Sequence, residues 1–217
     1  MKIKWNGHAS YTITSADGTV LVTDPYDPNG YEGAMQYAEV TDRADAAVVS
    51  HDHADHNYVA GLTGNPQIMK GSGNIKDIEI KGIETFHDES GGSERGKNVV
   101  FIINIDDMRV CFCGDLGHQL SDKQINIAGK IDILLVPVGG FFTLDAEGAA
   151  QLVGTLKPKI VIPMHYKTSK CGFPISDVEP FLALMKDVKK PNTVEIEIYA
   201  DQLPETGPET WVLNHAC

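Results

Sequence analysis

No long hydrophobic run occurs in this sequence. Nowhere do about 18 apolar residues, the length of a membrane-spanning helix, follow one another. The first residues, MKIKWNGHASYTIT, also lack the apolar run that a secretory signal peptide needs. We therefore expect a cytoplasmic protein that does not contact a membrane.

Positive charge is scarce as well. The 18 Lys and Arg residues stand against 30 Asp and Glu residues, and the formal net charge is −12 at pH 7. Such a field repels nucleic-acid phosphates and anionic lipids at long range. A nucleic acid is therefore not an expected partner, unless a local basic cleft overrides the overall charge.

Cysteine is too rare and too unevenly spaced to form a disulfide framework. The chain has four, at Cys111, Cys113, Cys171 and Cys217, and we expect reduced thiols. Cys111 and Cys113 fall on one face of a predicted strand and suit core packing. A chain of 217 residues buries roughly 70% of its unfolded surface, so one domain over residues 1–217 needs no cross-links.

Short runs rich in Val and Ile recur between turn residues, first as hairpins and then alternating with helical patterns. This order predicts a layered α/β domain. The expected strands are residues 2–5, 10–15, 19–24, 46–50, 77–86, 98–105, 108–114, 131–137, 159–164, 193–199 and 209–213. The expected helices are residues 57–62, 121–128, 145–156 and 176–188, the last opened by a possible capping box at Ser176.

The strongest chemical signal follows the predicted buried strand at 46–50. Three histidines and two aspartates stand within the six residues HDHADH, at positions 51–56. Three further residues of ligand type each stand at or just past the end of another predicted strand, where the sites of an α/β sheet lie. They are His87, Asp115 and His165. Imidazole and carboxylate ligands suit zinc, and manganese or iron almost as well.

Together these positions supply enough ligands for two divalent ions with open coordination positions. A closed structural zinc site needs only four ligands and usually contains cysteine, so the surplus indicates catalysis. The seven candidate ligands are His51, His53, Asp55, His56, His87, Asp115 and His165.

The sequence resembles the metallo-β-lactamase superfamily, whose signature H-x-H-x-D-H is met by His51, His53, Asp55 and His56. Within it, the runs WNGHAS at 5–10 and GDLGH at 114–118 are similar to the branch of predicted zinc-dependent hydrolases that includes ascorbate 6-phosphate lactonase. The resemblance covers residues 3 to 170 and implies a four-layer αββα sandwich.

The resemblance also implies how the ligands divide. One metal is expected at His51, His53 and His87, the other at Asp55, His56 and His165, and Asp115 bridges them. Asp24, in the run VLVTDP, would orient one ligand through a hydrogen bond.

We expect a hydroxide between the two ions to attack a small-molecule ester, lactone or phosphodiester. Asp55 and His118 are the candidate catalytic residues, and His8 and Arg95 are candidates for contact with an anionic substrate. Asn98, Lys167 and Lys170 flank the site in sequence and are weaker candidates.

Three other functions stay open. A nuclease of the same superfamily needs a basic surface that this chain lacks. A di-iron oxidoreductase of the flavodiiron kind typically carries Glu where this chain has His53. A non-catalytic metal- or ligand-binding module is the third. The segment 203–217 is expected either to cover the core or to meet a second subunit, so a homo-oligomer is also possible.

Overall fold

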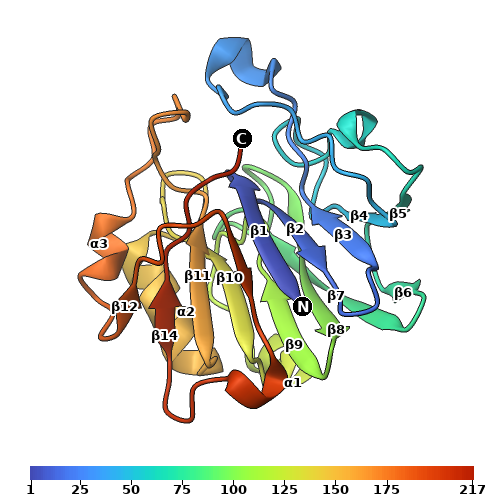
Figure 1. Ribbon diagram of the computed structural model, residues 1–217. Helices are drawn as coiled ribbons and strands as arrows, with labels where there is room; N and C mark the ends of the chain where they lie inside the picture. The colour runs from blue at the N-terminus through green and yellow to red at the C-terminus, as the bar shows by residue number, and fades with distance from the viewer.

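The computed structural model describes all residues, 1–217, and shows two β-sheets packed face to face (Figure 1). The six-stranded sheet has the order β13-β1-β2-β3-β4-β5. Its strands are β1 (Lys2–Gly7), β2 (Ser10–Thr14), β3 (Val20–Thr23), β4 (Ala46–Val48), β5 (Gln67–Met69) and β13 (Glu195–Glu197). Antiparallel hairpins build β1 to β3, and β4 and β5 then add in parallel.

The eight-stranded sheet has the order β12-β14-β11-β10-β9-β8-β7-β6. Its strands are β6 (Gly73–Ile75), β7 (Ile78–Phe86), β8 (Lys97–Ile105), β9 (Met108–Phe112), β10 (Ile133–Pro137), β11 (Ile160–Met164), β12 (Val188–Lys189) and β14 (Glu209–Trp211). β6 to β9 are antiparallel neighbours, whereas β9, β10, β11, β14 and β12 run parallel.

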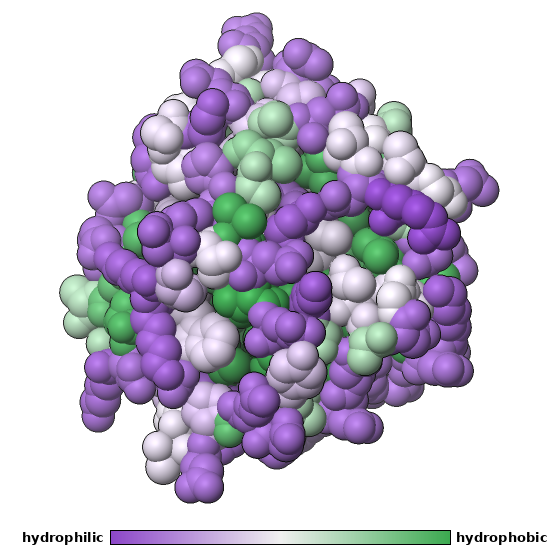
Figure 2. Space-filling view, viewed as in Figure 1, coloured by the Kyte–Doolittle hydropathy of each residue, from purple (hydrophilic) through white to green (hydrophobic).

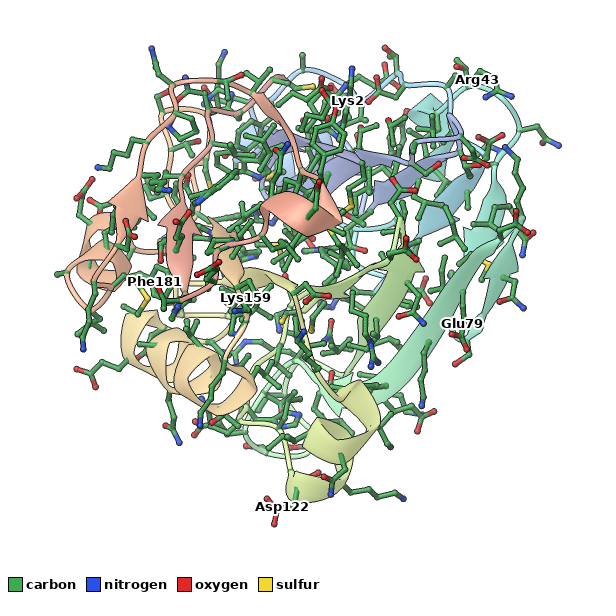
Figure 3. All side chains as sticks on the ribbon, turned by 60° about the horizontal axis from the view of Figure 1, so that its bottom comes forward. Lys2, Arg43, Glu79, Asp122, Lys159 and Phe181 are labelled. Carbon is green, nitrogen blue, oxygen red and sulfur yellow. The ribbon has the colours of Figure 1, made fainter.

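The main hydrophobic core lies between the sheets and contains 47 buried residues. Every residue of β10 and β11 is buried, as expected for parallel strands covered on both faces. Helices α1 (Asp122–Ala128) and α2 (Ala146–Leu156) cover the outer face of the eight-stranded sheet, and Figure 3 marks the start of α1 at Asp122. The predicted αββα class is confirmed.

The outer layer of the six-stranded sheet is thinner. It consists of the connecting segments with two short 3₁₀ helices, η1 (Gly30–Gly33) and η2 (Val59–Gly61), packed over a second cluster of 11 buried residues. The face seen in Figure 2 is mostly hydrophilic, with hydrophobic residues in small separate groups. No helix has the length and apolar character needed to cross a membrane.

Two helix predictions are wrong. Residues 57–62 form only η2, and residues 176–188 form only α3 (Glu179–Leu182) before the chain enters β12. The Ser176 amide donates to a loop carbonyl and Ser176 does not cap α3, while pairing with β14 extends the chain at Val188. The capping box lies instead at Ser121, before α1.

All the predicted strands form, whereas the two- and three-residue strands β5, β6 and β12 were not expected. After the 3₁₀ helix η3 (Ala200–Gln202) and β14, the C-terminal residues lie beside β1 (Figure 1). There the amides of Ala216 and Cys217 donate to the carbonyls of Trp5 and Asn6. The last residues of the segment 203–217 thus pack on β1 of the same chain.

Candidate metal centre

The candidate ligands meet at one edge of the two sheets because each follows the carboxyl end of a strand, and these strands run in the same direction. The residues that immediately follow β1, β3, β7 and β11 are His8, Asp24, His87 and His165. Asp115 comes three residues after β9, and the segment 51–56 follows β4. The parallel arrangement predicted this convergence.

Asp115 is the centre of the cluster and is only 2% exposed. Its Oδ2 atom lies 3.1 Å from Nε2 of His56, 3.1 Å from Nε2 of His87 and 3.3 Å from Nε2 of His165. The Nε2 atom of His51 lies 4.0 Å from the same oxygen. Four imidazoles from three segments of the chain therefore face one carboxylate.

The backbone that presents Asp115 requires a glycine before it. Gly114 has φ +54°, and a Cβ atom there would lie 2.5 Å from the Asn98 side chain and from Ser50. The Asp115 amide donates to Oδ1 of Asn98, at 3.0 Å. Asn98, considered earlier as a substrate contact, is instead buried and supports this turn.

Three histidines are oriented by hydrogen bonds from their Nδ1 atoms, which turn Nε2 toward the cluster. The partners are Asp24 Oδ2 for His56 at 2.8 Å, Ser50 Oγ for His51 at 2.9 Å, and the Phe142 carbonyl for His87 at 3.0 Å. Asp24 also accepts from the Ser50 amide at 2.7 Å. The predicted orienting role of Asp24 thus has a geometric basis.

Three groups of ligand atoms form within the cluster, each with all its atoms inside 4.8 Å, and the third, Asp24, His51 and His56, shares one histidine with each of the other two. His51, His53 and His87 form the first, while Asp55, His56 and His165 form the second, joined there by His8. This division is the same as the one implied by the resemblance, except for His8.

The donor set fits a divalent cation. Nε2 of His51 and Nδ1 of His53 lie 3.0 Å apart, and Oδ1 of Asp115 and Nε2 of His56 are buried without a hydrogen-bond partner. Lone pairs that face one another in this way need a cation between them, whether a proton or a metal ion. The first and second groups could therefore each hold one ion.

The ionisation of the cluster differs between its members. Burial, together with the neighbouring His56, lowers the pKa of His51 to about 2, and burial with the nearby His165 lowers the pKa of His8 to about 4. Burial also disfavours the charged form of His56, but the carboxylates of Asp115 and Asp55 outweigh it and raise the pKa of His56. Metal binding at His56 must therefore release a proton.

A cavity of about 290 Å³ opens onto both groups. Besides the ligands, its walls are the aromatic rings of Tyr31, Phe142 and Phe173 and the charged side chains of Glu94 and Arg95. The Tyr31 hydroxyl donates to Oδ1 of Asp55 at 3.1 Å. The aromatic walls could not be predicted from the sequence, because Phe142 and Phe173 come from loops and Tyr31 from the four-residue η1, none of which has a periodic pattern.

Arg95 reaches the cavity as predicted, on the loop that follows His87. Its guanidinium carbon lies 5.9 Å from the ring centre of Phe142, and Nη1 lies 3.3 Å from Glu94. Asp88 holds this loop by accepting backbone N–H bonds from four of its residues. The amides belong to Ser90, Gly92, Glu94 and Arg95, at 2.8, 2.8, 3.1 and 2.8 Å.

His118 is not brought to the cluster, so of the two predicted catalytic residues only Asp55 lies there. The Nε2 atom of His118 accepts from the Phe86 amide at 3.0 Å, and Nδ1 donates to the Gln119 carbonyl at 2.8 Å. Both ring nitrogens are thus used to fix the loop. Lys167 is likewise committed, to the Phe173 carbonyl at 2.7 Å.

Three residues of the centre have a left-handed backbone although none is glycine. His8, Asp24 and His165 have φ values of +52°, +34° and +49°. This region is sparsely populated by residues with a Cβ atom. Such strained positions cluster at functional sites, where the surrounding structure holds them in place.

The chain is similar to proteins of known family. The model of a family described as the β-lactamase superfamily domain matches residues 2–165. The chain is 34% identical to a crystal structure from Thermotoga maritima assigned to the Zn-dependent hydrolases of the metallo-β-lactamase superfamily, with a TM-score of 0.80 and coverage of 98% of this chain and 97% of that one.

A further relative and a further structure are similar to this chain. A metal-dependent hydrolase of Hyperthermus butylicus is 30% identical over 207 residues, which cover 82% of this chain and 87% of the relative. A metallo-hydrolase from Ignicoccus hospitalis shares the fold, with a TM-score of 0.62 at 21% identity over 91% of this chain and 98% of that one.

Proposed function

This chain belongs to the metallo-β-lactamase superfamily, and from that premise we propose that it is a metal-dependent hydrolase of a small-molecule ester, lactone or phosphodiester. The observation that carries the proposal is the convergence of four histidines on Asp115 beside a cavity of about 290 Å³. A structural metal site would be closed by protein ligands, whereas this one opens onto a cavity.

Two divalent ions, zinc by preference and manganese or iron as alternatives, would be held by the two ligand groups with Asp115 between them. When bound, they supply a hydroxide nucleophile near neutral pH and stabilise negative charge on the oxygen of the attacked group. The protein residues do the rest. Asp24, Ser50 and the Phe142 carbonyl fix the imidazoles so that their Nε2 atoms face inward.

The cavity residues then select and orient the substrate. Tyr31 stays protonated, because burial and the neighbouring Asp55 raise its pKa to about 12, so its hydroxyl is a hydrogen-bond donor above Asp55. Arg95 is placed to attract an anionic group of the substrate. Phe142 and Phe173 provide apolar walls that limit the access of water.

A cavity of this size favours a small molecule over a polymer. We propose no nucleic-acid substrate, since the net charge of −12 disfavours a polyanion. The similarity of the runs at 5–10 and 114–118 to the lactonase-containing branch makes lactones and phosphate esters the first compounds to test.

The test is elemental analysis of protein purified without added metal or chelator, followed by a screen of phosphodiesters, lactones and esters. We expect about two equivalents of metal per chain and hydrolysis of at least one class. The His53→Ala variant should lose metal from the His51, His53 and His87 group and most of the activity. His215→Ala is the matched control, because that histidine lies outside both ligand groups. Full metal content and full activity in His53→Ala would disprove the proposal.

A further inference from the structure

His8 belongs to the run WNGHAS, which the division of ligands between two metals leaves without a role. It lies in the turn between β1 and β2 and is 0% exposed. Its Nε2 atom lies 3.1 Å from Oδ2 of Asp55, and its ring centre lies 4.1 Å from that of His165. With the ring centre of His56 5.3 Å away, the residue lies beside all three other members of one ligand group.

The backbone of this turn is locked to the same group. The His8 carbonyl accepts from the indole Nε1 of Trp5 and from the amide of His165, both at 3.1 Å. Gly7 precedes it at φ +127°, where a Cβ atom would lie 2.6 Å from the ring of Tyr37. The turn thus cannot shift without moving His165, and the imidazole has one available orientation.

The hydrogen bond assigns the proton on the ring. His51, His56 and His87 place their Nδ1 proton on a protein acceptor, which leaves Nε2 free for a metal. Nδ1 of His8 is buried with no partner, which favours a proton on Nε2, where the ionised Asp55 accepts it. The geometry therefore favours His8 as a support for a ligand over His8 as a further ligand.

Asp55 is held from two sides by unequal partners. The buried His8 is hydrogen-bonded to Oδ2 of Asp55, while the half-exposed Tyr31 donates to Oδ1 of Asp55 from the surface. Since His8 is fully enclosed and Tyr31 is 47% exposed, the His8 bond is the more rigid of the two.

We infer that His8 is a positioning residue that sets the metal affinity of the Asp55, His56 and His165 group by fixing the Asp55 carboxylate through Nε2–H. The inference rests on the proposed function, because it requires that this group binds a metal. It predicts that the length and donor capacity of the side chain at position 8 matter, and not its ability to bind metal.

The experiment compares His8→Gln with His8→Asn. The amide nitrogen of Gln reaches the place of Nε2, whereas that of Asn reaches only the place of Nδ1, and both side chains are polar and similar in size. Each metal-free protein is titrated with Zn²⁺ by calorimetry and with Co²⁺ by visible absorption, and thermal unfolding checks that both variants fold. His215→Gln is the control for loss of a histidine outside the cluster.

We expect wild type to bind two equivalents, and His8→Asn to bind one equivalent normally and the other about 10- to 100-fold more weakly. His8→Gln and His215→Gln should follow wild type. Equal affinities in His8→Asn and wild type would overturn the inference, and equally weak binding by His8→Gln and His8→Asn would show that His8 is itself a ligand. If wild type binds no metal, the proposed function fails before any variant is compared.

Discussion

The two ligand groups differ in burial although one carboxylate serves both. Asp55, His56 and His165, here called the buried half, are all buried. In the open half, formed by His51, His53 and His87, the side chains of His51 and His87 are nearly buried as well, at 5% and 3% exposure, and His53 is the member that faces solvent. In the buried half, His56 and Asp55 are hydrogen-bonded to the ionisable side chains of Asp24 and His8. In the open half, His51 and His87 are hydrogen-bonded to the Ser50 hydroxyl and the Phe142 carbonyl.

This difference assigns different tasks to the two halves. A buried ligand group with several fixed partners loses little freedom when it binds a metal, so it should bind tightly and exchange slowly. His53 has no hydrogen-bond partner other than His51, and it borders a second surface cavity lined by Lys70, Arg95 and Lys97. We therefore expect metal to reach the centre from the side of His53.

Removing the shared residue should abolish the distinction and give the largest effect. In Asp115→Asn, the histidines of both halves lose their common carboxylate, and breaking such a buried charge arrangement costs about 3–5 kcal/mol, which corresponds to roughly 10²- to 10⁴-fold in affinity. Both zinc affinities should fall in a calorimetric titration, and hydrolysis should fall with them. If only one affinity changes, Asp115 does not serve both halves.

Asp24→Asn should weaken the buried half more than the open half. The change removes a charged acceptor that binds the His56 Nδ1 proton directly but reaches His51 only through Ser50, and loss of a direct partner typically costs about 10- to 100-fold in metal affinity. The measurement is the same titration, in which one of the two affinities should shift much more than the other. Asp52→Asn is the control, because Asp52 is an exposed neighbour of the open half that pairs with Lys70. An equal shift of both affinities would contradict the assignment.

Chelation should separate the halves by rate. When metal-loaded protein is mixed with excess chelator and a metal-sensitive dye, we expect two phases, with the faster one from the open half because His53 meets solvent. His53→Ala should remove the fast phase and leave the slow one. A single phase in wild type, or loss of the slow phase in His53→Ala, would reverse the comparison.

The smallest effect concerns the loop beside the open half. The backbone N–H groups of Arg95, Gly92, Glu94 and Ser90 lower the pKa of Asp88 to about 2, from an ordinary value of 3.8. Because the folded pKa is the lower one, the loop is fully stabilised above about pH 4 and loses this support as the pH falls toward 2.

Amide NMR shifts of Gly92 and Arg95 in metal-free protein should report this titration, with a midpoint near 2. Asp88→Asn at neutral pH should imitate the acid form and raise KM more than it lowers kcat, since it loosens Arg95 without touching a ligand. A midpoint near 3.8 would show that the amides do not hold the carboxylate.

Most of the ligand set was readable in the sequence because parallel strands bring their carboxyl ends together. The motif at 51–56 and the positions of His87, Asp115 and His165 needed only strand boundaries accurate to a few residues. His118 shows the limit of that reasoning. It stands three residues beyond Asp115, but Gly117 packs against the backbone at 87–88 and turns the chain away.

The cavity walls and the short edge strands were not readable for a different reason. Phe142 and Phe173 lie in loops and Tyr31 in the short η1 within a loop, and the paths of such segments are set by tertiary contacts rather than by local periodicity. The segment 176–188 has a helical pattern, yet it forms only the four-residue α3, and pairing of β12 with β14 extends the chain at its end. Long-range pairing of this kind overrides local propensity and leaves no mark in a short window.

The left-handed residues His8, Asp24 and His165 have a consequence for how this centre could evolve. Each costs about 1–3 kcal/mol of backbone strain, which the fold tolerates only while the side chain is useful. Selection for metal chemistry and selection for a relaxed backbone therefore oppose each other at these three positions. A descendant of this chain that lost its metals would be free to place glycine or asparagine there, and so could drift away from the function at positions 8, 24 and 165 while the motif at 51–56 was still intact.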